Sequence, residues 1–174
     1  MNNSVYDDLA LFLAHSVVLE REAAERFYEL AAMMQVHNND ALHRLFLELA
    51  RYSVDHVAEV EAIAHNHQLP EMKPWEYQWP HHEAPENLDY AEVHYLLTPA
   101  EALEMVIKVE QSAEAFYRGV GIQSADEAIR RYALEFAEEE HQHAEAAKSM
   151  KQQLATGNQK PDQKVDLDPP GVPE

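Results

Sequence analysis

Apolar side chains recur at spacings of three and four residues along four long segments of the chain, the spacing that places them on one face of an α-helix. The first segment begins near Ser4, and the second follows a polar break at residues 37–40. The third begins near Thr98 and the fourth near Ser124. Four helices with one apolar face each predict an all-α four-helix bundle, formed by a single domain over residues 1–155.

Residues that favour helix ends sharpen this prediction. Thr98-Pro-Ala-Glu101 combines an N-cap threonine, a proline in the first turn and a glutamate three residues after the cap, which together form a capping box. Ser124-Ala-Asp-Glu127 is predicted to begin the fourth helix in the same way, and Asn38 or Asn39 can cap the second. The third helix is predicted to end at Gly119 or Gly121.

The connection between the second and third helices, residues 68–98, has no helical period. It contains four prolines, the closely spaced aromatic residues Trp75, Tyr77 and Trp79, and the pair His81-His82. So long a connection fits a crossover along the bundle, which lets the third helix begin where the second began while the aromatic residues pack on the surface. His81-His82 can form an accessory metal site, although a surface pair is the commoner role. The polar, proline-rich residues 156–174 are predicted to be a disordered tail.

Each predicted helix has one polar interruption near the middle of its apolar stripe. The interrupting residues are Glu20, Ser53 with His56, Glu110, and Glu140 with His143. Because a buried charge is costly unless it is paired or binds a metal, these side chains are expected to meet in one layer. Two imidazoles and three carboxylates suit iron, Mn(II) or Zn(II). The alternative is a set of ordinary hydrogen-bonded core residues, which usually occur singly.

Two overlapping Glu-x-x-His pairs occur in the fourth helix, Glu138/His141 and Glu140/His143. Positions two residues apart lie about 200° apart around a helix, so only one pair can face the core. Register with Phe136, an apolar residue of the same stripe, selects Glu140 and His143.

Composition narrows the classes of function. The formal net charge is −19, from 32 acidic against 13 basic residues, which argues against binding to nucleic acid or to anionic membranes and makes cations the natural partners. The absence of cysteine excludes disulfides, thiolate metal sites and iron–sulfur clusters. The N-terminus lacks the basic region of a signal peptide, and the most apolar run, Leu9–Leu19, is too short to span a bilayer. A soluble, cytoplasmic protein is therefore expected.

The sequence resembles the ferritin-like di-iron carboxylate proteins, and among them the rubrerythrin branch, over about residues 5–153. The segments that carry the resemblance are Leu19–Tyr28, Ser53–His56, Glu110–Tyr117 and Glu138–His143. The family takes one glutamate from each of helices 1 and 3 and a Glu-x-x-His pair from each of helices 2 and 4. The resemblance implies a ferritin-like bundle whose metal ligands are Glu20, His56, Glu110, Glu140 and His143. It also implies two irons per chain when the site is complete, O2 or peroxide as substrate, and a homodimer.

Ser53 departs from that pattern, because it stands where the family has a metal-bridging glutamate. Three carboxylates leave an excess of positive charge on two divalent ions, so the second metal should bind more weakly. Glu114, one turn after Glu110, or a water beside Ser53 can compensate, whereas Glu59 is expected at the surface. Tyr117 is a candidate hydrogen-bond donor near the site.

Two functions stay open. The first is a rubrerythrin-like oxidase or peroxidase, and it needs an external electron donor because rubrerythrins carry a Cys-ligated iron domain that this chain, without cysteine, lacks. The second is a binding or storage module that holds one metal, such as Zn(II), without turnover. A scaffold with a relic site is a third interpretation.

Overall fold

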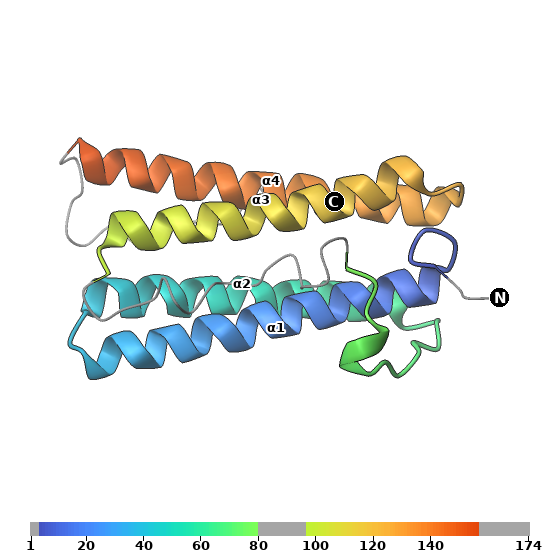
Figure 1. The fold of residues 1–174 in the computed structure, drawn as a ribbon, viewed down its shortest axis with the longest axis horizontal. Helices are drawn as coiled ribbons and strands as arrows, with labels where there is room; N and C mark the ends of the chain where they lie inside the picture. The colour runs from blue at the N-terminus through green and yellow to red at the C-terminus, as the bar shows by residue number, and fades with distance from the viewer. Residues whose placement is uncertain (1–3, 80–96, 157–174) are drawn as a thin grey trace.

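Four long helices make up most of the computed structural model, which describes residues 4–79 and 97–156 (Figure 1). The elements are α1 (Leu9–Val36), α2 (Asp40–Ala64), the short 3-10 helix η1 (Pro74–Glu76), α3 (Pro99–Gln123) and α4 (Glu127–Ala155). The predicted all-α four-helix bundle is confirmed. His81-His82 and residues 157–174 of the predicted tail lie outside the described residues.

The bundle consists of two antiparallel hairpins, α1 with α2 and α3 with α4, whose members pack closely along their length. The first hairpin turns through Asn38, whose φ of 55° is a left-handed conformation that asparagine tolerates. Figure 1 shows that α2 ends at one end of the bundle and that α3 begins at the other. The α3 helix therefore begins beside the start of α2, at the end of the bundle opposite to the end of α2, while residues 80–96 of the predicted crossover lie outside the described residues.

The first helix begins later than the sequence suggested. Its N-cap is Asp8, whose carboxylate accepts a hydrogen bond from the backbone N–H of Leu11 at 3.1 Å. The carbonyl of Ser4 instead accepts from the N–H groups of Asp7 and Asp8 and forms a separate turn. The prediction of a start near Ser4 is wrong because a second capping residue lies four positions further on.

The capping box of α3 is confirmed. The Thr98 hydroxyl accepts from the N–H of Glu101 at 3.3 Å, and the Glu101 carboxylate accepts from the N–H of Thr98 at 2.9 Å. The predicted end at Gly119 or Gly121 is wrong, because α3 continues to Gln123. Gly121 permits close approach of α3 and α4 rather than ending the helix: a Cβ placed there would lie 2.8 Å from side-chain atoms of Leu134.

The N-cap of α4 is Asp126, not Ser124. Its carboxylate accepts hydrogen bonds from the N–H groups of Ala128 and Ile129, which are free at the start of a helix. The Ser124 hydroxyl donates to the carbonyl of Tyr6 at 2.7 Å and so ties the α3–α4 loop to the N-terminal segment.

The beginning of the crossover packs on α1 through a buried histidine. His15 Nδ1 lies 2.8 Å from the carbonyl of Leu11, and its Nε2 accepts from the N–H of Gln78 at 3.0 Å. The Trp79 ring lies edge-on to the rings of His15 and Phe116, at 5.2 and 5.5 Å. The expected packing of crossover aromatics is therefore seen at Trp79, whereas Trp75 is exposed.

Buried apolar side chains form two clusters along the bundle, one on each side of its middle. The first cluster includes Phe27, Leu30, Phe46 and Val106. The second includes Phe12, Phe116, Tyr117 and Phe136. In every helix the predicted polar interruption falls between the two clusters, so the polar layer is enclosed by apolar packing at both ends. None of the described helices is long and apolar enough to cross a membrane.

Candidate metal centre

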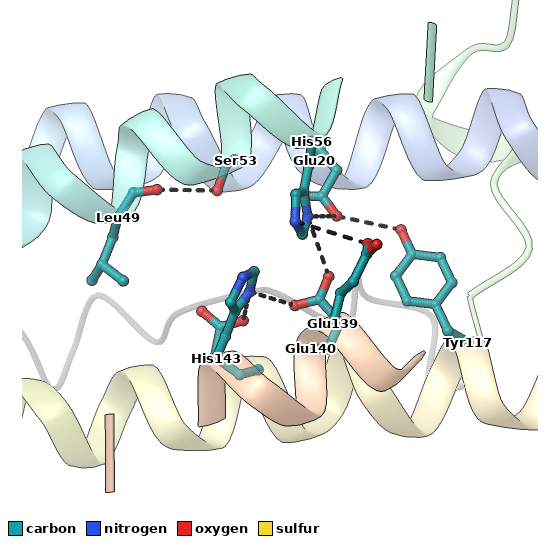
Figure 2. Close-up of polar contacts among 9 residues, drawn as sticks. Glu20, Leu49, Ser53, His56, Tyr117, Glu139, Glu140 and His143 are labelled. Atoms are coloured by element: carbon teal, nitrogen blue, oxygen red, sulfur yellow. Dashed lines mark hydrogen bonds and ion pairs between the residues drawn. The ribbon is translucent and has the colours of Figure 1, made fainter. Parts of the chain in front are cut away.

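The structure brings the five predicted ligands together at mid-height of the bundle. His56 Nδ1 lies 3.7 Å from Glu20 Oε1 and 3.8 Å from Glu140 Oε1. His143 Nδ1 lies 3.4 Å from Glu140 Oε2 and 3.6 Å from Glu110 Oε2. Glu140 thus stands between the two histidines and turns one oxygen toward each (Figure 2).

The two imidazoles also contact each other. The rings of His56 and His143 stack with centroids 4.9 Å apart and an interplanar angle of 28°. Each ring presents its Nδ1 to carboxylates of the layer. His141 lies outside this layer and is paired with Glu114, so the register that selected Glu140 and His143 places both at the centre.

Burial makes this arrangement costly without a cation. Glu20, Glu110 and Glu140 are all buried. Among the described residues, Glu140 Oε1 has no hydrogen-bond partner, although buried carboxylate oxygens nearly always have one. This oxygen lies 3.8 Å from His56 Nδ1, too far for a hydrogen bond, which indicates a place beside it for a positively charged ligand.

The pKa values show how the layer adapts. Burial, together with the negative charges of Glu20 and Glu110, raises the pKa of Glu140 well above its ordinary value, so the metal-free layer favours the protonated form of this carboxyl group. Burial also acts to raise the pKa of Glu110, but the adjacent His143 outweighs burial and lowers it.

The pKa values of the two histidines are raised, whereas burial alone would lower them. Burial acts to lower the pKa of His56, but its interaction with Glu20 outweighs this effect, and the pKa lies above its ordinary value. The pKa of His143 is raised in the same way by Glu110. The metal-free layer therefore favours protons on both histidines and on Glu140, where a metal would supply positive charge.

A cavity of about 20 Å³ adjoins the layer, enough for one water-sized species. The five predicted ligands, Ser53 and apolar side chains such as Leu49 and Val106 line it. Ligand atoms of His56, Glu140 and His143 lie within 4.8 Å of one another, a spacing that one cation can bridge after small side-chain movements. The nitrogen and carboxylate donors fit Fe, Mn or Zn. The residues present therefore fit a metal.

Ser53 lines the cavity but its hydroxyl donates, at 3.5 Å, to the carbonyl of Leu49 on its own helix (Figure 2). Tyr117 is fully buried, and its hydroxyl donates to Glu20 Oε1 at 3.4 Å, which agrees with its predicted place beside the site. Glu114 does not compensate for Ser53. Its carboxylate binds Arg118 at 2.7 Å and His141 at 3.2 Å, outside the cavity lining.

Two residues at the site escaped the sequence reasoning. Glu139 Oε2 lies 3.9 Å from His56 Nε2, and burial raises the pKa of Glu139. Tyr52 places its ring 6.0 Å from that of His143. Glu139 directly precedes Glu140, and Tyr52 directly precedes Ser53, so a prediction based on one stripe of each helix omits them. Their position next to a predicted inward residue is the sequence signal that could have found them.

No family model matches the chain, and no curated protein matches it. Among solved structures, it is similar to an uncharacterized conserved protein from Magnetospirillum magnetotacticum MS-1. The two are 35% identical with a TM-score of 0.68, and the match covers 84% of this chain and 95% of that one. Likeness of this extent in both sequence and structure shows common membership, and the chain therefore belongs to the family of that uncharacterized conserved protein.

Proposed function

We propose that the chain is a ferritin-like metalloprotein of the rubrerythrin type, with a two-iron site at Glu20, His56, Glu110, Glu140 and His143 that reduces O2 or peroxide. One observation carries the proposal: the buried Glu140 carboxylate lies between two imidazoles, and its Oε1 has no hydrogen-bond partner among the described residues. A carboxylate in this position can bridge two cations, and each imidazole can serve one of them. The proposal includes a homodimer and an external electron donor.

The chain's own residues have definable tasks in this function. Bound iron would supply the electron-transfer chemistry toward O2 or peroxide. Glu140 and the two histidines would release their protons when metal binds, since all three have raised pKa values in the metal-free protein. Tyr117 holds Glu20 Oε1 through its hydroxyl and fixes the orientation of that carboxylate. The apolar clusters on both sides restrict access of water.

Aerobic oxidation of anaerobically Fe(II)-loaded protein tests the proposal. The expected result is ferric absorption of the oxo-bridged type, consumption of peroxide, and two irons per chain. Glu140→Gln should abolish the absorption, whereas Glu138→Gln should leave it intact, because Glu138 belongs to the other Glu-x-x-His pair and bonds Gln142 on the exposed face. If the parent protein shows no ferric absorption and consumes no peroxide, the oxidase function is refuted.

A second function, a binding or storage module that holds one metal without turnover, is favoured by Ser53. Its hydroxyl is engaged with the Leu49 carbonyl, and Glu114 bonds elsewhere, so the layer offers three carboxylates. Three negative charges suit one divalent cation better than two. Metal content of protein purified without added metal separates the functions: one zinc or one iron per chain supports the second.

A further inference from the structure

A second group of candidate ligands lies on the other side of His56 from the buried layer. It consists of His56 and Glu59 from α2 and Glu139 from α4, which each offer a ligand atom within 4.8 Å of the others. His56 Nε2 lies 3.9 Å from Glu139 Oε2. We call these three residues the outer cluster. One imidazole nitrogen and two carboxylates are donors of the same kind as those of the buried layer.

Exposure falls steadily from the outer cluster to the buried layer. Glu59 is exposed, and the side chain of Glu139 is 34% exposed. The side chain of His56 is 15% exposed, whereas that of Glu140 is 2% exposed. His56 therefore lies on a route between solvent and the layer, with carboxylates on both sides of its ring.

The two nitrogens of His56 face different partners. Nδ1 faces Glu20 at 3.7 Å and Glu140 at 3.8 Å, and Nε2 faces Glu139 (Figure 2). A neutral imidazole has one lone pair for a cation, because its other nitrogen carries the proton. His56 can thus bind a cation on its outer side or on its inner side, but not on both at once.

We propose that the outer cluster captures a divalent cation from solvent and that His56 passes it to the buried layer by exchanging Nε2 for Nδ1 as the ligand atom. In this exchange Nδ1 gives its proton to the adjacent Glu20 or Glu140 carboxylate, and Nε2 takes up a proton from solvent once the cation has left it. The inference rests on the proposed metal binding by the buried layer. It assigns Glu59 a role in the rate of metal uptake and none in the final complex. The net charge of −19 attracts cations to the whole surface, and the outer cluster gives them one place of entry.

Stopped-flow uptake of Co(II) by the metal-free, full-length protein tests the proposal, with the d–d absorption of bound Co(II) as the signal. Glu59→Gln should slow uptake severalfold at low Co(II) and leave the final stoichiometry and dissociation constant unchanged. Asp55→Asn is the matched control. It removes the same charge from an exposed position of the same helix and should take up Co(II) at the parent rate.

Equal uptake rates for Glu59→Gln and Asp55→Asn would overturn the proposal. A lower Co(II) stoichiometry in Glu59→Gln would also overturn it, because Glu59 would then be a permanent ligand. Failure of the parent protein to bind any Co(II) would instead refute metal binding by the buried layer, so the two failures can be distinguished. Circular dichroism of each variant checks that the helices remain intact.

Discussion

At the scale of single residues, Glu140 decides the energetics of the polar layer. Its carboxylate is 2% exposed, lies beside two other buried carboxylates, and has one oxygen without a partner among the described residues. A buried, unsatisfied polar atom costs about 1–3 kcal/mol. In the metal-free protein the raised pKa of Glu140 favours its protonated form, which lessens the charge that is buried, and a bound cation would remove the cost.

Glu140→Gln should therefore separate metal binding from folding. The variant is expected to lose affinity for Zn(II), while its metal-free form unfolds at the same or a higher urea concentration than the parent, because a buried acidic group has been removed. Thermal unfolding with and without Zn(II) measures both effects. Glu138→Gln, on the exposed face, should retain the Zn(II)-dependent increase in melting temperature. Loss of that increase in both variants would contradict the assignment of Glu140 as a ligand.

Ser53→Glu should restore the fourth carboxylate of the layer. Ser53 lines the cavity and is buried, so a glutamate there would add negative charge next to His56 and Glu140. We expect tighter binding of a second metal, together with a loss of about 1–3 kcal/mol of stability in the metal-free protein. Metal content after dialysis measures the first effect. Ser53→Gln is the control for volume without charge, and an unaltered stoichiometry in Ser53→Glu would show that residue 53 does not serve the site.

Metal affinity should rise with pH. The pKa values of His56, His143 and Glu140 are all raised, so each binds a proton more readily in the metal-free layer than an ordinary group does, and a cation must compete with that proton. Affinity is therefore expected to fall as pH is lowered from 7.5 to 6, with release of up to three protons, one from each group. Calorimetric titration with Zn(II) in buffers of different ionisation enthalpy counts these protons. An affinity independent of pH would contradict the protonation described here.

At the scale of elements, the helix ends show where sequence reasoning succeeds and where it fails. The sequence predicts Thr98 as an N-cap because proline and glutamate follow it in a capping box, and the structure confirms this. The N-caps predicted at Ser4 and Ser124 are wrong, because Asp8 and Asp126, a few residues further on, cap the helices instead. Local sequence offers several capping groups near each start, and tertiary contacts decide among them, such as the bond from Ser124 to the Tyr6 carbonyl.

Substitution by alanine should have opposite effects on stability at the two glycines of α3. A Cβ at Gly119 would have only Gln123 Nε2 nearby, at 3.8 Å, so Gly119→Ala should stabilise the helix by about 1 kcal/mol. At Gly121 the Cβ would lie 2.8 Å from Leu134 atoms, so Gly121→Ala should be about 1–3 kcal/mol less stable than Gly119→Ala. Urea unfolding of the two variants measures the difference. Equal stabilities would contradict the close approach of α3 and α4.

The anchor of the crossover on α1 should weaken in acid. Burial lowers the pKa of His15 below its ordinary value of 6.5, so the unfolded chain takes up this proton more readily than the folded one. The contribution of His15 to stability is fully present above about pH 6.5 and is lost as pH falls through the lowered pKa. Urea unfolding at pH 7 and pH 5 should show that the free energy of unfolding falls less in His15→Gln than in the parent when the pH is lowered. An equal decrease in the two proteins would contradict a neutral His15.

At the scale of the whole molecule, the ligands of the layer are divided between the two hairpins. Glu20 and His56 come from α1 and α2, whereas Glu110, Glu140 and His143 come from α3 and α4. The sequence predicted this division because polar interruptions at matching heights can be read from helical periodicity. It could not predict the approach of Glu139 to His56, since contacts between helices depend on their packing and on side-chain rotamers.

A metal that joins the two hairpins should stabilise the complete fold. Removal of bound metal with a chelator is expected to lower the melting temperature, because a ligand held only by the folded state stabilises it. The parent protein and Glu140→Gln, each scanned with and without chelator, provide the comparison, and only the parent should change. An unchanged melting temperature of the metal-loaded parent would favour a structural scaffold with a relic site.

The division of the ligands also bears on when the protein can acquire its metal during synthesis. A nascent chain that has emerged as far as α3 presents Glu20, His56 and Glu110, but neither Glu140 nor His143. The carboxylate that lies between both imidazoles thus leaves the ribosome after Glu20, His56 and Glu110. A metal held by all five predicted ligands would require that α4 has been translated and that both hairpins have assembled, so chains that end before α4 should hold it less tightly.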